Sequence, residues 1–211
     1  MISVDPTTGI PGIELAFVMD LLLQFLFSML RIGAFLIASP LFGARYIPLP
    51  VRIVGTVALA FGIFPLIQIP PVAVLSQLSA VAIMIQELVI GLAAGLSMTI
   101  LFGAAATAGD RIANAAGLGF ASQIDPSSGS QSPVVSQILS LLFLVTFLAE
   151  DGHLTAIRIM LDSYLYVPIG TSANLLVLLD VGVRTAGEMF FFAVQLMMPV
   201  VAVLLLVNTV I

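Results

Sequence analysis

Charged residues inside apolar segments are the first candidates for chemistry in this sequence. Near the C-terminus, Asp180, Arg184 and Glu188 are spaced four residues apart, which places them on one face of a helix. Arg158 and Asp162 have the same spacing. Opposite charges at this spacing can neutralise one another along a helix. They can also line a polar route for ions, because ionisable groups inside a membrane often mark such routes. Both interpretations remain open.

Three further charges stand alone in apolar surroundings. Asp20 and Arg31 lie eleven residues apart, or roughly 16 Å along a helix, which is too far for a direct contact. Burying either charge without a partner costs several kcal/mol, so we expect contacts from other helices or other subunits. Glu87 precedes Gly91 by one helical turn and Gly95 by two. This Gly-x-x-x-Gly spacing favours close helix packing around Glu87, with a functional carboxylate as the alternative.

The residue types needed for catalysis or metal binding do not cluster in this sequence. The only histidine, His153, has Asp151 nearby but no further ligand at metal-binding spacing, so we interpret it as a turn residue. The chain has no cysteine. The serines at 127, 128, 130 and 132 form no nucleophile elbow, and no glycine-rich phosphate loop is present. We therefore expect a protein that is not an enzyme and uses no metal or cofactor.

The composition is that of a membrane protein. Hydrophobic residues make up 61% of the 211 residues and charged residues 8%, whereas ordinary globular domains carry about 25% charged residues. The surplus of apolar side chains must face lipid or other subunits. The chain has no lysine, and its arginines are scattered singly. Nucleic-acid binding is therefore not expected, because it requires a basic patch.

The apolar segments predict an all-α fold of membrane-associated helical hairpins. Residues 14–38 and 49–69 form one predicted hairpin, and residues 72–119 form a long helical segment that we expect to break at Gly103 or Gly109. The second half of that segment is rich in Ala and Gly, which predicts packing inside protein. Further helices are predicted at 134–150, at 154–166 and from 172 onward, with Pro199 inside the last. The sequence stops at Ile211 within an apolar run, which we interpret as a C-terminal truncation.

One long polar segment separates two of these helices. Residues 121–133 read ASQIDPSSGSQSP, a composition typical of turns. Loops of this length between helices are uncommon and often functional. The segment is either a surface loop in water or a movable constriction, since irregular backbone at membrane depth is tolerated only inside protein or along an aqueous path.

In their order and spacing, five stretches of the chain resemble the FliR family of the flagellar export apparatus, whose counterparts in virulence secretion are the SctT proteins. The stretches are LRIGAFLIASPLFGARYIPLPVR (30–52), QELVIGLAAGL (86–96), AGDRIANAAGLGFASQIDPSSGSQSPVVS (108–136), EDGHLTAIRIMLDSYLYVPIG (150–170) and the apolar region from Pro199 to Asn208.

The resemblance implies a structural and gating subunit of a type III protein export gate in the bacterial inner membrane, at a flagellar basal body or an injectisome. Its partners would be FliP-like and FliQ-like subunits, an FlhB-like switch protein, membrane lipid and the unfolded proteins that are exported. Residues 1–133 would form a FliP-like helical part, and residues 134–211 the remainder with the start of a FliQ-like part.

The resemblance also assigns roles to residues. The family's plug loop corresponds to Phe120–Pro133, with Asp125 and Pro126 matching its Asp-Pro. Its central residues are Phe120, Ala121, Ser122, Gln123, Ile124, Asp125, Pro126, Ser127, Ser128 and Gly129. The residues expected to pack against neighbouring subunits are Arg31, Glu87, Gly91, Gly95, Asp110, Asp162, Arg184 and Glu188. The alternative function is a secondary transporter or ion channel that uses intramembrane carboxylates for coupling: Asp20, Glu87 or the face formed by Asp180, Arg184 and Glu188.

Overall fold

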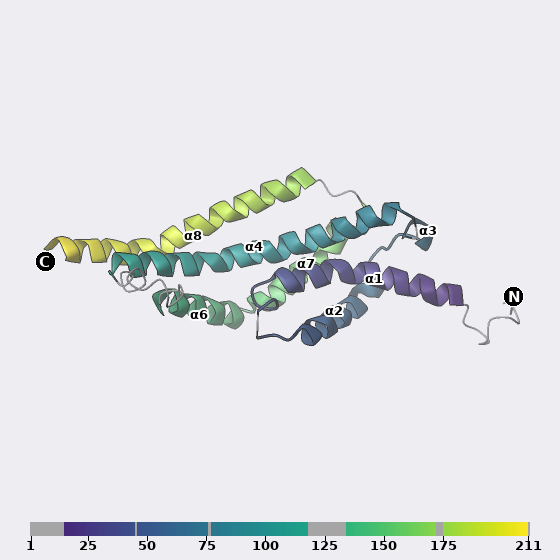
Figure 1. Cartoon of the computed structure of the whole chain (residues 1–211), viewed down its shortest axis with the longest axis horizontal. Helices are drawn as coiled ribbons and strands as arrows, with labels where there is room; N and C mark the ends of the chain where they lie inside the picture. Colours follow the sequence, from purple (N-terminus) through teal and green to yellow (C-terminus); the bar gives the residue numbers. More distant parts are fainter. Residues whose placement is uncertain (1–14, 45, 76, 118–133, 172–174, 211) are drawn as a thin grey trace, which may run out of the picture. The chain divides into compact units, whose positions relative to one another are not determined.

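In the ranges that it describes, residues 15–44, 46–75, 77–117, 134–171 and 175–210, the computed structural model is helical and contains no strand. Figure 1 shows the course of the chain. This confirms the predicted all-α fold. The elements are α1 (Leu15–Ala38), α2 (Leu49–Ile63), the 3₁₀ helix η1 (Phe64–Leu66), α3 (Val72–Leu75), α4 (Ser79–Ala115), α6 (Val134–Ala149), α7 (Gly152–Tyr166) and α8 (Leu175–Val210).

Four described helical segments are long and apolar enough to cross a membrane: Phe17–Ala38, Leu49–Leu66, Ser79–Ala115 and Asp180–Val210. Helices α6 and α7 together pass the same test but are bent by 68° at the break between them, so they could form a fifth, broken span. With 37 residues, α4 is roughly 55 Å long, well beyond the ~30 Å hydrocarbon core of a bilayer. Part of α4 must therefore lie outside the hydrocarbon if it crosses the membrane along its normal.

The chain divides into two compact units. Unit 1 comprises residues 1–38, 42–95 and 158–174, and unit 2 comprises residues 39–41, 96–157 and 175–211. Helix α4 thus contributes its first half to unit 1 and its second half to unit 2. The boundary between residues 1–133 and 134–211, which the family resemblance implies, is a separate matter and stays a prediction.

In unit 1, α1 and α2 form the predicted hairpin and lie side by side (Figure 1). Helix α2 begins after Pro48, and Pro50 stands in its first turn, where a missing N–H costs no hydrogen bond. Arg52 holds the connector in place, because its Nη2 donates to the carbonyl oxygens of Ala44 at 2.7 Å and Ile47 at 3.0 Å. The rings of Phe25 and Phe64 meet edge to face at the other end of the hairpin.

The break expected in the third apolar segment lies elsewhere. Helix α3 ends at Leu75, α4 starts at Ser79, and α4 continues without interruption through Gly103 and Gly109 to Ala115. The prediction of a break at either glycine was wrong. Both glycines lie within the continuous helix. At Gly109 the missing side chain allows close packing, because a Cβ there would lie 2.3 Å from the Cα of Ser136. After α4, Gly117 adopts a φ of 77°, the left-handed conformation that commonly ends a helix.

The turn between α6 and α7 is short. Asp151 has a φ of 53°, a conformation that Asp tolerates better than most residues. His153 lies in the first turn of α7 rather than in the connecting turn. Its Nδ1 atom is buried and has no hydrogen-bond partner among the described residues.

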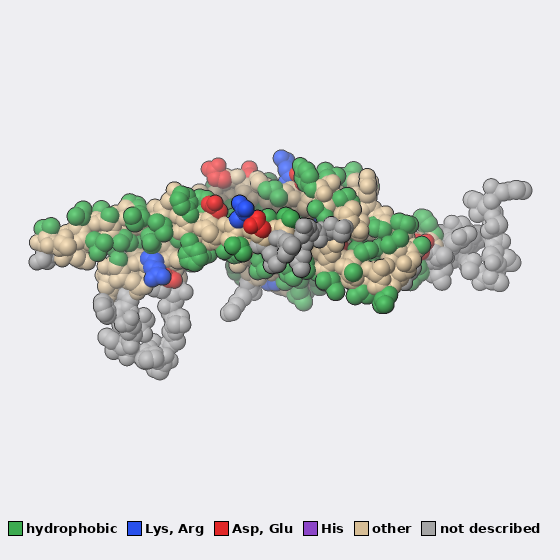
Figure 2. Space-filling view, turned by 90° about the horizontal axis from the view of Figure 1, so that it is seen from above, with side chains coloured by type: hydrophobic (Ala, Val, Ile, Leu, Met, Phe, Trp, Pro, Cys, Tyr) green, Lys and Arg blue, Asp and Glu red, His purple; other side chains and the backbone are tan. Residues whose placement is uncertain are grey.

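Apolar side chains are widely exposed in both units. On the face shown in Figure 2, hydrophobic side chains extend over much of the surface and charged ones are confined to a few places. Almost none of the candidate span in α8 is buried within the chain. Soluble monomers rarely expose apolar patches of more than a few hundred Å², so these surfaces require lipid or another protein against them.

Candidate functional site

The centre of unit 1 is a buried ion pair between α1 and α4. Arg31 Nε lies 2.7 Å from Glu87 Oε2, and Arg31 Nη2 lies 3.0 Å from Glu87 Oε1. The guanidinium therefore donates two hydrogen bonds to the carboxylate. Both side chains have 0% exposure. This two-pronged geometry is the strongest arrangement available to a carboxylate and an arginine.

The same guanidinium also binds the end of α7. Arg31 Nη1 donates to Ser163 Oγ at 3.1 Å, and Nη2 donates to the carbonyl oxygen of Val167, just beyond α7, at 2.8 Å. With the two bonds to Glu87, four of the five N–H donors of Arg31 are engaged. One side chain on α1 therefore fixes both α4 and α7.

Tyr164 completes this cluster from α7. Its ring centroid lies 4.3 Å from the Cζ of Arg31, a cation–π distance. Its hydroxyl donates to the carbonyl oxygen of Ser28 on α1 at 2.7 Å, and the side chain is 2% exposed. We call Arg31, Glu87, Ser163 and Tyr164 the polar lock, because these four side chains join three helices in one cluster.

A seam of small residues brings α1 and α4 close enough for this contact. A Cβ on Gly91 would lie 2.2 Å from the carbonyl oxygen of Arg31, and one on Gly95 would lie 2.6 Å from the Cβ of Ala38. Glu87, Gly91 and Gly95 thus form one face of α4 that meets α1. The contacts advance in the same direction along both helices, so α1 and α4 are parallel.

Chemically, the polar lock is suited to holding helices together rather than to moving protons or ions. Its carboxylate and guanidinium are fully buried and bonded to each other. An ion route needs a group that reaches an aqueous path. Gly91 and Gly95 then fix the helix spacing at which the two charged groups meet.

The charges of α8 form a separate, exposed feature. Arg184 Nε lies 2.7 Å from Asp180 Oδ2, with side-chain exposures of 78% and 58%. The spacing of these two residues had predicted such a pair. Glu188 is exposed one turn further along α8. Arg158 and Asp162 are also exposed on α7, and these two described residues form no ion pair with each other. Asp20 is exposed on α1.

In unit 2, the Ala-rich half of α4 packs against α6 and α8, as its composition predicted. Ala104, Ala108 and Ala193 form a buried cluster. Ser136 at the start of α6 donates its Oγ hydrogen to the carbonyl oxygen of Ala106 at 2.9 Å. The ring of Phe102 packs on two rings of α6, those of Phe143 and Phe147, with centroids 4.9 and 5.2 Å away. Asp110 is half-buried, and its Oδ1 has no hydrogen-bond partner in the described ranges.

Gly109 should be the least tolerant position of this second contact. We expect Gly109→Ala to lower the free energy of unfolding by about 1–3 kcal/mol, because the added methyl group would meet the backbone of Ser136. Gly103→Ala is the matched control on the same helix, since its methyl group would meet only the flexible Met189 Sδ at 3.3 Å. Chemical unfolding of both variants in a mild detergent checks this. Equal losses in the two variants would contradict the packing shown.

Sequence reasoning placed the members of the polar lock separately. It singled out Arg31 and Glu87 and expected partners for each on other helices, but it did not pair them, and it missed Ser163 and Tyr164. A signal for the pairing of Arg31 with Glu87 was present in the sequence. These two residues are single charges of opposite sign within apolar helices, and each needs neutralisation where lipid or protein replaces water. Arg31 and Glu87 contact each other inside the chain. Their packing against other subunits stays a prediction, as does that of Asp110, Asp162, Arg184 and Glu188.

The plug-loop residues 120–129 lie outside the described residues. Where the structure is described, no group of three or more His, Asp or Glu side chains is placed to hold a metal ion.

Comparison with known proteins assigns the chain to a family. Residues 22–211 match the family described as bacterial export proteins, family 1. The chain is 31% identical to the flagellar biosynthetic protein FliR of Pectobacterium carotovorum subsp. carotovorum over 185 residues, which cover 88% of this chain and 70% of the relative. It is 31% identical to FliR of Escherichia coli (strain K12), with 87% and 70% covered. It is 29% identical to FliR of Bacillus subtilis (strain 168), with 90% and 74% covered. The chain, a helical protein with several candidate membrane spans, therefore belongs to the FliR family of bacterial flagellar export proteins.

Proposed function

We infer that this chain is a structural and gating subunit of a type III protein export gate, in which it forms part of the pore for unfolded substrates together with FliP-like and FliQ-like subunits. The observation that carries this proposal is the family match, which extends from residue 22 to residue 211. The chain would act in the bacterial inner membrane, without catalytic residues, beside an FlhB-like switch protein. Residues 1–133 would be its FliP-like part and residues 134–211 the remainder, with the start of a FliQ-like part.

Two structural features support a role in assembly. The polar lock fixes α1, α4 and α7 within unit 1, so this unit can present a defined surface to neighbours. Many large apolar side chains remain exposed on the helices, including Phe61 at 76% and Val183 at 72%. Interfaces of obligate complexes are rich in such side chains.

The gating role belongs to the segment 120–133. Its flanks are held together within unit 2: Gly109 near the end of α4 packs against Ser136 near the start of α6, and the Ser136 hydroxyl bonds to α4. A segment whose two flanks are fixed can move between positions without loosening the helices that carry it. Such an arrangement suits a movable constriction.

Removal of Ser127–Ser130 tests the gating role. We expect the shortened chain to assemble with its partners as the unaltered chain does, while closure is impaired. The measurement is ion leakage across the membrane of cells or vesicles that contain the assembled complex. Deletion of an equal number of residues from 1–12, before the first helix, serves as the control. Unchanged leakage with normal assembly would contradict a closing role for this segment.

Reconstitution of the chain alone tests the alternative of a transporter or ion channel. We expect no proton-dependent or solute-dependent flux, because Glu87 is sealed in its bond to Arg31. Flux that disappears in Glu87→Gln would contradict the proposal and favour the transporter.

A further inference from the structure

The last turns of α4, in unit 2, carry a row of polar side chains. Thr107, Arg111 and Asn114 are spaced by four and three residues, which places them along one face of the helix. We call these three residues the polar stripe. Arg111 and Asn114 are exposed, and Thr107 is half-buried. Between residues 100 and 115, every other residue except Asp110 is alanine, glycine or a larger apolar residue. The stripe is therefore a polar face on an otherwise apolar part of the helix.

The packing of unit 2 leaves the polar stripe uncovered. Helix α6 packs against Gly109, and α8 packs against Ala104 and Ala108. Arg111 forms no ion pair with any described residue, its neighbour Asp110 included. Asp110 lies beside the stripe, and its packing against another subunit stays a separate prediction. The polar stripe therefore requires polar surroundings beyond the described helices of this unit.

Helix α8 shows the depth at which the polar stripe lies. In unit 2, α4 and α8 run in the same direction (Figure 1), because Met189 lies next to Gly103 and Ala193 lies one turn further along both helices. From Met189 to Val210, α8 contains no charged residue. This stretch is roughly 33 Å long, about the thickness of the hydrocarbon core of a bilayer. Arg111 lies roughly 12 Å beyond Gly103 along α4, so it falls well within the depth of the uncharged stretch.

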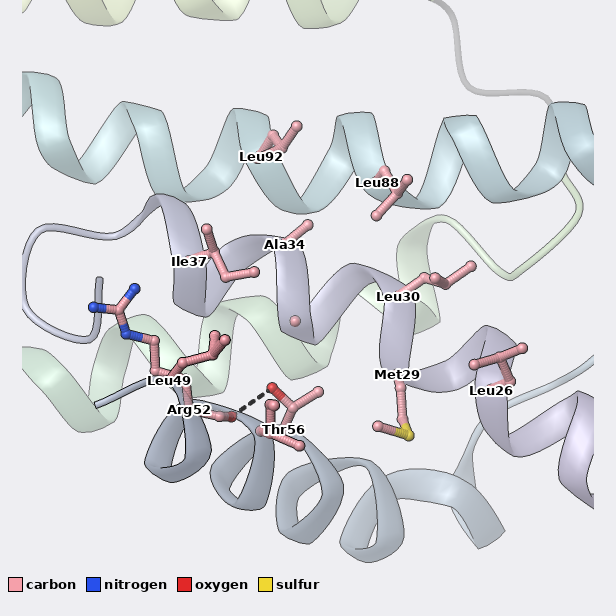
Figure 3. A pocket seen from close by; sticks show the side chains of 12 residues that line it. Leu26, Met29, Leu30, Ala34, Ile37, Leu49, Arg52, Thr56, Leu88 and Leu92 are labelled. Carbon is pink, nitrogen blue, oxygen red and sulfur yellow. Dashed lines mark hydrogen bonds between the residues drawn. The ribbon is translucent and has the colours of Figure 1, made fainter. Parts of the chain in front are cut away.

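The apolar groove of unit 1 is a useful contrast. It lies between α1, α2 and α4 (Figure 3), and only Arg52 and Thr56 among its lining residues are polar. Both of these side chains donate to backbone carbonyl oxygens of the same unit. The side chains of the polar stripe, by contrast, make no such bond to a described residue. The two surfaces therefore suit different surroundings.

Neither lipid nor an apolar partner helix suits the polar stripe. In lipid, an exposed arginine at hydrocarbon depth is strongly disfavoured. Against an apolar helix, the guanidinium of Arg111 would be buried without a counter-ion. Water in a protein-lined path solvates both this guanidinium and the amide of Asn114. We propose that the polar stripe lines the aqueous path of the export gate, along which the exported polypeptide passes. This inference rests on the proposed function and specifies which face of the chain meets the path.

Labelling of single cysteines in the assembled complex tests this assignment. The chain contains no cysteine, so Arg111→Cys and Asn114→Cys each introduce one thiol at an exposed position. The reactive form is the thiolate, which requires water around it. The probes are a small charged methanethiosulfonate and a maleimide attached to a polyethylene glycol chain as large as a protein. We expect the small probe to label both variants and the large probe to label neither, because the path admits only a narrow molecule.

Met198→Cys is the matched control. It introduces a thiol at a similar depth of unit 2, at an exposed apolar position of α8, and we expect neither probe to label it. Loss of labelling by the small probe at both Arg111→Cys and Asn114→Cys would overturn the proposal, because the stripe would then be covered by a partner or by lipid. Labelling by both probes would overturn it too, because the stripe would then lie on an open surface. The complex must contain the FliP-like and FliQ-like subunits. If the unaltered chain forms no such complex, the proposed function itself is contradicted.

Discussion

Replacing Glu87 with leucine should lower the free energy of unfolding by about 3–5 kcal/mol. The variant leaves the guanidinium of Arg31 buried at 0% exposure without its counter-ion. Two of the four hydrogen bonds of Arg31 disappear, while those to Ser163 and Val167 remain and keep the cation in its buried position. The cost therefore comes mainly from an unpaired buried charge.

A double variant distinguishes this cause from a general loss of packing. Arg31→Met with Glu87→Leu removes both charges and fills the space with apolar atoms, a replacement that is often nearly neutral for buried ion pairs. It should recover much of the loss. Glu188→Leu, at an exposed carboxylate of α8, should change stability by no more than about 0.5 kcal/mol. Chemical unfolding in mild detergent measures all three. A double variant as unstable as Glu87→Leu would show that the ion pair is not the source of the effect.

The second large effect is expected at Gly91. A methyl group at this position would lie 2.2 Å from the carbonyl oxygen of Arg31 and 2.8 Å from the Cβ of Ala34, both on the adjoining helix. Neither atom belongs to a long side chain that can turn away, so α1 and α4 must separate. We expect Gly91→Ala to lose about 3 kcal/mol, the upper end for an overfilled core, because separation also strains the ion pair beside it.

Gly62→Ala is the matched control for this substitution. Gly62 lies in α2 of the same unit, and no atom stands within 4 Å of the position that its Cβ would occupy. Because alanine is the better helix former, this variant should be as stable as the unaltered chain or up to about 1 kcal/mol more stable. Unfolding in detergent, followed by circular dichroism, compares the two. If Gly91→Ala behaved like Gly62→Ala, the close contact between α1 and α4 would be wrong.

The helices could largely be predicted from sequence because their apolar runs are long and their ends carry strong signals. Pro48 and Pro50 indicated the start of α2, and the turn before α7 was evident from Asp151 and Gly152. The continuity of α4 could not be predicted. A glycine in a helix predicts a weak point, and only the presence of Ser136 against Gly109 shows that this glycine serves close packing.

The site was predictable in its members but not in its geometry. A lone Arg31 and a lone Glu87 in apolar helices each require a partner, yet 56 residues separate them, and helical periodicity reports only which residues share a face. Tyr164 and Ser163 gave no signal, because their types are ordinary in a helix of mixed polarity.

Co-purification tests the central claim, that this chain is a built-in subunit of an export gate, most directly. The chain is co-expressed with the FliP-like and FliQ-like proteins of its own host, isolated through a tag on this chain and weighed by native mass spectrometry. We expect one complex of defined mass that contains all three proteins, and we expect Gly91→Ala to yield less of that complex than Gly62→Ala. A stable chain that is isolated alone, with neither partner bound, would contradict the proposed role in an export gate.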